Sequence, residues 1–339
     1  MCAFEKKEKY NVAIAGVTGA VGETFLEILA ERNFPINKLK PLASARSAGK
    51  KITYQGKEYE VEELRHDSFE DVDIALFSAG GDRSLEFAPS AVKSGAVVVD
   101  NSSAYRMDDE VPLVVPEVNP DDAFKHKGII ANPNCTTIIM VVALKPLYDF
   151  SKIKRVVVSS YQSASGAGAQ GMYELEEQAK AWAKGEKLKV ENFQYQLLFN
   201  VIPHVDKFME NGYTKEEMKM YNETKKILGD KSVPVSATCV RVPVLTAHSE
   251  SIFVETEEKI SAKKAKELFS GAKGLQVMDN PEKNEYPLPL LAAGKDDCYV
   301  GRIREDISCE NALSFWVCGD QLRKGAALNT IQIAELLIK

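Results

Sequence analysis

The stretch Ala131-Asn132-Pro133-Asn134-Cys135-Thr136-Thr137-Ile138 joins two parts of the chain. The apolar residues 128–131 before it predict a buried strand, and the almost wholly apolar residues 136–147 predict a helix. The proline suits the first turn of a helix, and either asparagine can cap it. The sequence therefore predicts a strand that passes directly into a helix, with Cys135 at the junction.

Cys135 occupies a position that favours a reactive thiol. The N–H groups at the start of a helix have no partners within the helix, and together with the helix dipole they stabilise a thiolate. The same donors can stabilise a developing oxyanion. The alternative is an inert buried cysteine, which is common in protein cores. The flanking sequence is needed to decide between these two interpretations.

The composition predicts a water-soluble protein with two domains. The length of 339 residues exceeds that of a typical single domain. A content of 45% hydrophobic and 27% charged residues is ordinary for a globular protein. No stretch approaches the roughly 20 apolar residues that span a bilayer, so we expect no membrane insertion. Residues 1–9 mix acidic and basic side chains and lack the apolar core of a secretory signal, which favours a cytoplasmic protein.

Charge and cysteine spacing argue against two further classes of protein. The net charge is −6 and the chain shows no basic stripe, which argues against nucleic-acid binding. The chain has 6 cysteines but no Cys-x-x-Cys pair, which argues against a zinc site or a dithiol redox site. We therefore expect free thiols and no metal.

A glycine-rich turn near the N-terminus predicts a dinucleotide site. Residues 10–15 predict a strand, residues 23–31 predict a helix, and glycines at 16, 19 and 22 lie between them. The pattern is Gly-x-Gly-x-x-Gly except that Thr18 replaces the second glycine, and such turns bring backbone N–H groups close to a phosphate. A turn that binds no ligand is the alternative. The predicted cofactor-binding residues are Gly16, Thr18, Gly19, Ala20 and Val21.

The next two predicted strands end in loops suited to the rest of a nucleotide. The strand at 39–43 ends in Ser44-Ala45-Arg46-Ser47, and an arginine with hydroxyls suits a ribose 2′-phosphate better than a free 2′-hydroxyl. We therefore predict NADP rather than NAD, bound by Ser44, Arg46 and Ser47; a solvated basic loop is the alternative. The strand at 72–77 is followed by Ser78-Ala79-Gly80, at the carboxyl end where nucleotide folds bind ligands.

Residues 100–106 follow the strand predicted at 96–99 and form a candidate anion site. Their hydroxyl and amide groups, followed by Arg106, suit an anion. A surface arginine without a function is the alternative. Because strands and helices alternate up to this point, we predict a Rossmann-type, doubly wound α/β domain that ends near Asn132.

The second part of the chain carries candidate substrate-binding groups. The β-branched residues 153–162 predict a strand that ends at Gln162, and the small residues 163–168 allow a ligand to approach the backbone, unless they serve packing alone. Glu216 and Lys219 share one face of a predicted helix, which by itself indicates only a surface ion pair.

A reactive cysteine needs a partner that carries a proton. Histidine suits this role because its pKa lies near neutral pH. The chain contains 4 histidines, of which His66 and His126 lie in polar stretches. His204 and His248 remain, and His248, which follows a predicted strand that carries Arg241, is only slightly favoured.

Six motifs resemble those of the aspartate-semialdehyde dehydrogenases. They are residues 16–22 (GVTGAVG), 132–137 (NPNCTT), 161–162 (YQ) with 165–168 (SGAG), 241–244 (RVPV) with 248–250 (HSE), 300–304 (VGRIR) and 324–329 (KGAALN). The resemblance extends from Tyr10 to the C-terminal residues. One departure is Ala247, next to the histidine, where the family is expected to have glycine.

The resemblance implies a reaction and an architecture. The family reduces L-aspartyl 4-phosphate with NADPH to L-aspartate 4-semialdehyde and phosphate through a cysteine thioester, in the biosynthesis of lysine and diaminopimelate, threonine and methionine. The implied fold is a Rossmann-type NADP-binding domain, residues 1–132 with 320–339, and an α+β catalytic and dimerisation domain with a mixed sheet, residues 133–319. A homodimer is implied, with a tetramer as the alternative.

The resemblance also implies four catalytic residues. Cys135 would be the nucleophile, and His248 would be the acid–base residue. Gln162 would orient the acyl intermediate, and Asn134 would contribute to the oxyanion site.

Substrate and cofactor contacts follow from the same resemblance. Arg241 would bind the substrate carboxylate and Arg106 the phosphate, with Glu216 and Lys219 assisting. Further contacts with the cofactor are expected from Ser165, Gly166 and, at the nicotinamide end, Asn329.

Three related enzymes and one non-enzyme are the alternatives. N-acetylglutamyl-phosphate reductases share the thioester chemistry but typically have glycine before the cysteine, where this chain has Asn134. Archaeal-type malonyl-CoA reductases share that chemistry too. Glyceraldehyde-phosphate dehydrogenases have a Cys-Thr-Thr run, but their other motifs differ. A noncatalytic paralogue is expected to lose Cys135 or His248, and both are present.

Overall fold

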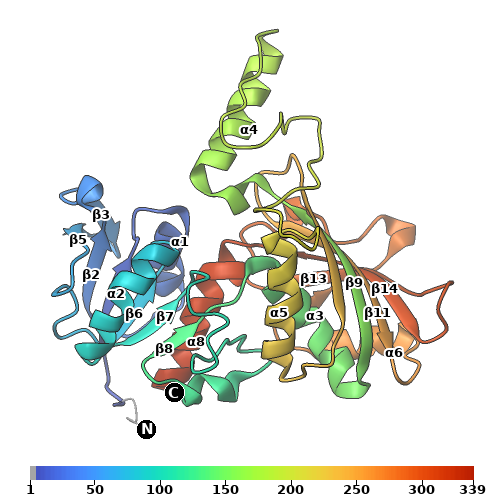
Figure 1. The fold of residues 1–339 in the computed structure, drawn as a ribbon, viewed down its shortest axis with the longest axis horizontal. Helices are drawn as coiled ribbons and strands as arrows, with labels where there is room; N and C mark the ends of the chain where they lie inside the picture. The colour runs from blue at the N-terminus through green and yellow to red at the C-terminus, as the bar shows by residue number, and fades with distance from the viewer. Residues whose placement is uncertain (1–4) are drawn as a thin grey trace. The chain divides into compact units, whose positions relative to one another are not determined.

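The computed structural model describes residues 5–339 and contains two compact units, each with its own sheet (Figure 1). The first unit ends at Pro133 and is completed by Ala326–Lys339, and the second comprises Asn134–Gly325. The expected boundary at residue 320 lies before the observed one, because the Asp320 carboxylate accepts a hydrogen bond from the Gly294 N–H (2.7 Å) within the second unit. Residues 1–4, which include Cys2 and the start of the segment predicted not to be a signal, lie outside the described residues.

The first unit is built on a six-stranded sheet with the order β5-β2-β1-β6-β7-β8, and every strand pair in it is parallel. Strand order reverses between β1 and β6, which is the point where such sheets bind ligands beyond their carboxyl ends. The strands are β1 (Tyr10–Ala15), β2 (Ile36–Ala43), β5 (Glu62–Glu63), β6 (Ile74–Phe77), β7 (Val97–Asp100) and β8 (Ile129–Ala131).

Side chains of β1 point alternately into two cores. Val12 and Ile14 pack in a core with α1 (Ala20–Glu31) and α8 (Leu328–Ile338). Ala13 and Ala15 pack in a second core with α2 (Gly81–Lys93). A strand segment that is buried on both faces needs apolar residues at every position, as β1 has from Val12 to Ala15. This is the predicted doubly wound arrangement.

Shorter elements complete the first unit. The hairpin of β3 (Lys51–Tyr54) and β4 (Lys57–Glu60) turns at Gln55-Gly56, where both residues adopt the positive φ that a tight hairpin turn requires (47° and 76°). The 3₁₀ turns η1 (Ala45–Ser47) and η2 (Pro120–Lys125) lie in loops after strands.

The second unit is built on a mixed six-stranded sheet with the order β10-β9-β11-β14-β13-β12. The pairs β10–β9 and β12–β13 are parallel, and the other pairs are antiparallel. The strands are β9 (Ile153–Gln162), β10 (Val235–Arg241), β11 (His248–Thr256), β12 (Leu275–Val277), β13 (Cys298–Glu305) and β14 (Ala312–Gly319).

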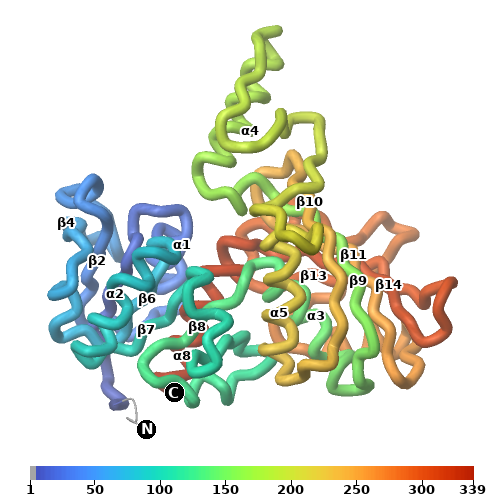
Figure 2. Tube along the Cα trace, in the orientation of Figure 1, coloured from blue at the N-terminus to red at the C-terminus, as the bar shows by residue number. Residues whose placement is uncertain are grey.

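Helices cover one face of this sheet. The apolar helix α3 (Cys135–Phe150) packs against β11 and β14, and it contacts α5 (Lys215–Leu228) and α6 (Ala262–Ser270) on either side. Val157, on the other face, is 42% exposed. The helix α4 (Gly168–Ala183) and the segment after it extend away from the sheet of this unit (Figure 2). A short helix, α7 (Pro289–Ala292), precedes β13.

Two properties concern the whole described chain. Among residues 5–339, no helix combines the length and apolar character needed to cross a membrane. The described cysteines, at 135, 239, 298, 309 and 318, are free thiols.

Candidate active site

Cys135 begins α3, and its sulfur lies 3.5 Å from Nε2 of His248. The helix is capped by Asn134, whose side-chain oxygen accepts a hydrogen bond from the Thr137 N–H (3.2 Å). The thiol is partly exposed, whereas His248 is fully buried. The structure therefore brings His248, and not His204, to the candidate nucleophile; the ring of His204 stacks on Phe208 instead.

The sheet of the second unit explains why these groups meet. Gln162 is the last residue of β9 and pairs in register with Arg241, the last residue of the parallel strand β10. The neighbouring strand β11 runs in the opposite direction, so it starts at this edge with His248. Three strand ends and the N-terminus of α3 thus place four of the predicted site residues together.

Glu216 connects these groups, and it is buried rather than part of a surface pair. Its Oε1 accepts hydrogen bonds from the side-chain amides of Asn134 (2.9 Å) and Gln162 (3.1 Å), and its Oε2 accepts one from Lys219 (2.9 Å). Burial alone would raise the pKa of Glu216, but Lys219 and these amides hold it below its usual value. Lys219 also donates to Asp206 (2.8 Å). The carboxylate is therefore charged and fixes the orientation of both amides.

Arg241 is buried and held in one orientation. Its Nη1 donates to the backbone oxygen of Ser163 (2.6 Å), and its guanidinium lies 5.9 Å from the centre of the Phe193 ring. Burial lowers the pKa of Arg241, and the charge of Glu216 opposes that shift. A Cβ at Gly166 would lie 2.7 Å from Nη1 and 3.1 Å from Cε1 of His248, so only glycine fits there.

The environment of His248 keeps its ring uncharged near neutral pH. Nδ1 accepts a hydrogen bond from the Ser163 N–H (3.1 Å) and lies 3.0 Å from the Ser163 hydroxyl. Burial and the positive charge of Arg241 lower the pKa of His248 to about 3, although Glu216 opposes this shift. Ala247, just before it, has a φ of 70°. Glycine adopts that conformation without strain, which is a physical reason for the glycine expected there.

In the first unit, three of the predicted cofactor loops meet at the carboxyl edge of the sheet. The N–H groups of Gly16 and Val17 both donate to the Leu42 oxygen, at the end of β2 (2.8 and 3.2 Å). Gly16 has a φ of +91°, and a Cβ there would lie 2.4 Å from the Ser78 oxygen. The turn at 16–22 therefore lies against the loops that begin at Ser44 and at Ser78.

These loops offer groups that suit phosphates. Gly19 and Gly80 precede α1 and α2, and neither helix has a side-chain cap, so the N–H groups of both first turns are left for a ligand or water. Ser44 and Arg46 are exposed while Ser47 is buried, and within residues 5–339 Arg46 forms no ion pair. The residues present fit a phosphorylated dinucleotide.

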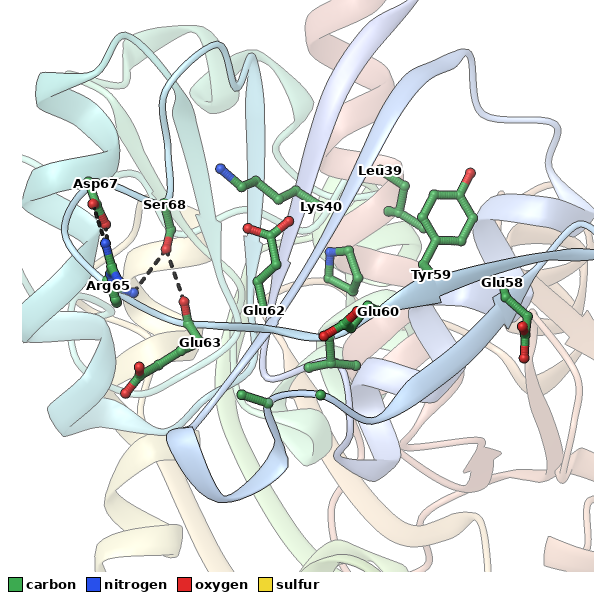
Figure 3. A pocket seen from close by; sticks show the side chains of 14 residues that line it. Leu39, Lys40, Glu58, Tyr59, Glu60, Glu62, Glu63, Arg65, Asp67 and Ser68 are labelled. Carbon is green, nitrogen blue, oxygen red and sulfur yellow. Dashed lines mark hydrogen bonds and ion pairs between the residues drawn. The ribbon is translucent and has the colours of Figure 1, made fainter.

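A pocket beside β2 and β5 suits that ligand less well (Figure 3). Its walls include four glutamates, at 58, 60, 62 and 63, with Lys40 among them. Arg65, at its end, is paired with Asp67 (2.6 Å). A wall of carboxylates repels phosphate, and the pocket includes none of the predicted cofactor residues.

Arg106 and Asn329 both bond to Asn132, at the end of the first unit's main segment. Arg106 is buried and donates through Nε to the Asn132 oxygen and through Nη2 to the Asn101 oxygen (both 2.9 Å). The Asn329 amide donates to Oδ1 of Asn132 (2.7 Å) and to the oxygen of Val114 (3.0 Å). These contacts hold the backbone just before the candidate nucleophile.

Sequence reasoning missed several residues that support the site. Glu223 accepts the N–H of Asn134 (2.6 Å), and it lies two helical turns after Glu216 on the same face of α5, a spacing that could have revealed it. The Thr136 hydroxyl donates to the Asn134 side chain (2.5 Å). The Ser163 hydroxyl contacts His248, and the Gln321 side chain accepts a hydrogen bond from the Ala247 N–H. No local sequence pattern indicates Ser163 or Gln321. Within the described part of the chain, no group of three or more His, Cys, Asp or Glu residues could hold a metal ion.

Comparisons with known proteins agree with the division into two parts. Residues 11–126 match the family model described as semialdehyde dehydrogenase, NAD binding domain, and residues 144–324 match semialdehyde dehydrogenase, dimerisation domain. An aspartate-semialdehyde dehydrogenase of Aquifex aeolicus (strain VF5) is 58% identical over 334 residues, which are 97% of this chain and 98% of the relative.

Two solved structures extend the comparison. Aspartate semialdehyde dehydrogenase II complexed with ASA from Vibrio cholerae is 47% identical, with a TM-score of 0.95, over 98% of this chain and 99% of that one. Aspartate semialdehyde dehydrogenase with NADP from Candida albicans is 26% identical, with a TM-score of 0.76, over 97% of this chain and 98% of that one.

The similarity covers both units and almost the whole chain, and the family models include the glycine turn and the strand ends at Gln162, Arg241 and His248. The family inferred from the six motifs is confirmed. A nicotinamide-binding domain joined to a dimerisation domain accounts for both halves of the fold, and the chain belongs to the aspartate-semialdehyde dehydrogenase family.

Proposed function

We propose that this chain catalyses the NADPH-dependent reductive dephosphorylation of L-aspartyl 4-phosphate to L-aspartate 4-semialdehyde and phosphate. The product is used in the biosynthesis of lysine and diaminopimelate, threonine and methionine. The observation that carries the proposal is the sulfur of Cys135 at the N-terminus of α3, 3.5 Å from His248 and beside a buried Arg241. The ASA bound to the Vibrio cholerae relative supports the substrate.

Cys135 forms the covalent intermediate. Its thiolate, stabilised by the start of α3, attacks the acyl carbon of the substrate. The bond from that carbon to the phosphate oxygen breaks, phosphate leaves, and a thioester remains on Cys135. First-turn N–H groups of α3 stabilise the oxyanion, and each such donor contributes roughly 3–4 kcal/mol. Asn134 supports this oxyanion site by holding the start of the helix.

The cofactor contributes one chemical step. When bound, the reduced nicotinamide supplies a hydride to the thioester carbonyl. The first unit would hold it through the turn at Gly16, Thr18, Gly19, Ala20 and Val21 and the loops at Ser44, Arg46, Ser47, Ser78, Ala79 and Gly80. Asn329 is assigned to the nicotinamide end, and Ser165 and Gly166 are assigned as further contacts with the cofactor. The exposed Arg46 supports NADP over NAD.

His248 manages the proton of the last step. After reduction, the carbon–sulfur bond breaks, the aldehyde leaves and the sulfur of Cys135 is restored as a thiolate. His248, whose Nε2 lies 3.5 Å from the sulfur, is assigned the acid–base role in this step. Gln162, fixed by Glu216, orients the acyl group during these steps.

The substrate carries a carboxylate, an ammonium group and a phosphate. Arg241 binds the carboxylate through paired hydrogen bonds, with Glu216 and Lys219 assisting. Arg106 is assigned to the phosphate. We further propose that the enzyme works in the cytoplasm as a homodimer or a tetramer built through its dimerisation domain.

The test is an assay of phosphate-dependent NADPH formation from aspartate semialdehyde, with malonate semialdehyde and N-acetylglutamate semialdehyde as competing substrates. We expect aspartate semialdehyde to be turned over most efficiently, and Cys135→Ala to abolish turnover while NADP still binds. A higher kcat/KM with either competitor would replace the proposed substrate. A clear preference for NAD would overturn the cofactor assignment.

A further inference from the structure

A buried chain of hydrogen bonds ends on Nδ1 of His248. It begins at the backbone N–H of Ala247, which donates to Oε1 of Gln321 (2.8 Å). The Gln321 amide nitrogen donates to the Ser165 hydroxyl, the Ser165 hydroxyl lies 3.0 Å from that of Ser163, and the latter lies 3.0 Å from Nδ1. All five residues are buried, so water does not compete for these groups.

The direction of the bonds at the Gln321 end of this chain follows from the first donor. A backbone N–H can only donate, so the contact with Ala247 fixes which end of the Gln321 amide is oxygen. The amide nitrogen then donates to Ser165, which allows the Ser165 hydrogen to point to Ser163 and the Ser163 hydrogen to point to His248. The Ser163 hydroxyl has a second acceptor, Oε1 of Gln321, but that contact is longer (3.4 Å).

The backbone of Ser163 gives the same answer independently. Its N–H donates to Nδ1 of His248 (3.1 Å), and a nitrogen that accepts this bond cannot carry a proton. From these two converging donors we propose that Ser163, Ser165 and Gln321 are positioning residues that fix His248 as the neutral tautomer protonated at Nε2, facing the sulfur of Cys135.

This assignment specifies how His248 acts in the proposed reaction. It therefore deepens the proposed function and rests on it. An Nε2–H donates to the sulfur, so the resting ring cannot be the base that removes the thiol proton. Cys135 attacks as a thiolate that receives this hydrogen bond. The Nε2–H of His248 donates a hydrogen bond to the oxyanion of each tetrahedral intermediate until phosphate or the aldehyde leaves, so the ring neither gains nor loses a proton.

The charged and titratable groups around the ring are consistent with this state. Arg241 of β10 faces it with a positive charge, Glu216 of α5 with a negative one, and Cys135 of α3 lies against Nε2. A second proton on Nδ1 would point at the N–H of Ser163 and add a charge beside Arg241. Both effects disfavour the imidazolium.

The first experiment observes the tautomer directly in the full-length protein without substrate. With ¹⁵N-labelled histidine, a two-bond proton–nitrogen correlation reports which ring nitrogen is protonated. The chain has 4 histidines, so the signals lost in His248→Asn identify the ring. We expect an unprotonated Nδ1 and a protonated Nε2 from about pH 6 to about pH 8. A protonated Nδ1 in this range would overturn the inference, whatever substrate the enzyme uses.

The second experiment disrupts the chain of hydrogen bonds at Gln321. In Gln321→Glu the new carboxylate cannot donate to Ser165, so the two serine hydroxyls no longer have a fixed direction. Nδ1 then keeps only the Ser163 N–H as a donor, and we expect a mixed tautomer. We expect kcat to fall by roughly 10²-fold or more, the scale of general acid–base catalysis, with KM for aspartate semialdehyde nearly unchanged. A folded variant with wild-type kcat and an unprotonated Nδ1 would contradict the role of Gln321.

A matched pair at position 163 covers the case in which that variant fails to fold. Ser163→Thr keeps the hydroxyl and should keep both the tautomer and kcat. Ser163→Ala keeps only the backbone donor and should show a mixed tautomer and a lower kcat. Equal tautomer populations in these two variants would remove the hydroxyl chain from the mechanism, and wild-type protein that shows the expected tautomer but ignores aspartate semialdehyde would instead refute the proposed function alone.

Discussion

At residue 166 the site has room for a hydrogen atom but not for a methyl group. The Cβ of an alanine there would meet Nη1 of Arg241 at 2.7 Å and Nε2 of His248 at 3.2 Å. Arg241 cannot swing away freely, because it is bonded to the Ser163 oxygen. The glycine thus sets the spacing between Arg241 and His248, the residues proposed to bind the carboxylate and to act on the reacting oxygen.

Gly166→Ala is therefore expected to lower kcat/KM by roughly 100-fold, the cost of displacing reacting groups by about 1 Å. The melting temperature should change little, since Gly166 itself is exposed and lies outside the hydrophobic cores. Steady-state kinetics and a thermal melt measure the two effects. Gly271→Ala, at a C-cap with a φ of −90° and contacts no nearer than 3.8 Å, is the control and should keep full activity. Unchanged kinetics in Gly166→Ala would mean that the two side chains can move apart.

Glu250, two residues after His248, is buried without a partner for either carboxylate oxygen among the described residues. The hydroxyl of Ser160, directly across from it on β9, is also unpaired. Burial raises the pKa of Glu250 well above its ordinary value. The folded protein therefore keeps this carboxyl protonated at pH values where the unfolded chain ionises it.

The sign of the pH effect follows. A pKa raised by folding contributes stability at low pH, and that stability is lost as pH rises from the unfolded value of about 4.3 toward the folded one, by about 1.4 kcal/mol per pH unit. Glu250→Gln has no such dependence. We expect its melting temperature to gain on the wild type as pH increases from about 5.5 to about 8. Parallel curves for the two proteins would show that Glu250 is ionised when folded.

At the scale of elements, α5 holds the candidate nucleophile in place. Glu216 and Glu223 project from one face of this helix to the side chain and the N–H of Asn134. The helix starts with a capping box, in which Thr214 accepts from the Glu217 N–H and the Glu217 side chain accepts from the Thr214 N–H. The cap fixes the turn that carries Glu216, so local helix stability is linked to the geometry at Cys135.

Thr214→Ala should cost about 1 kcal/mol of stability, the usual effect of losing an N-cap. It should also lower kcat several-fold, because Glu216 lies in the first turn. Ser261→Ala removes the equivalent cap of α6, whose side chain accepts from Lys264 (3.1 Å). We expect it to cost similar stability, by urea denaturation, with no loss of activity. Equal effects on kcat in both variants would mean that the cap of α5 has no specific influence on the geometry of the site.

Local sequence patterns predicted several helices and strands of this fold, but not the contacts between distant residues. The glycine turn, β9 and the helix after Cys135 follow from local periodicity, and the structure has them within a few residues of their predicted bounds. The choice between His204 and His248 depended on which strand ends lie together, so local patterns favoured His248 only slightly and the resemblance was needed to assign it. The bond between Ser163 and Gln321 joins residues 158 positions apart, so no local pattern could reveal it. Burial of Glu216 likewise depends on how α5 packs against α3.

At the scale of the molecule, the first unit is assembled from two separate stretches of chain. Leu328, Ile331 and Leu337 of α8 are buried in the same core as Val12 and Ile14 of β1. The central sheet thus depends on a helix that follows the whole second unit in sequence.

Ile331→Ala is expected to lower the free energy of unfolding of the first unit by about 2–5 kcal/mol, as for other large-to-small core changes. Ile307, which is fully exposed, provides the control, and Ile307→Ala should stay within about 0.5 kcal/mol of the wild type. The free energies of unfolding of the two variants are measured by guanidinium denaturation, with loss of NADP binding as the signal for unfolding of the first unit. A change in Ile331→Ala no larger than that of the control would mean that α8 adds little to the core.

The late position of α8 also sets the order of events during synthesis. Domains usually fold as they leave the ribosome, the N-terminal one first. Here β1, α1 and β6 emerge early, but the face of their sheet that α1 and α8 cover lacks α8 until Asn134–Gly325 has been translated. The nascent nucleotide-binding unit therefore exposes apolar surface throughout translation of the second unit, which makes it a candidate client of ribosome-associated chaperones.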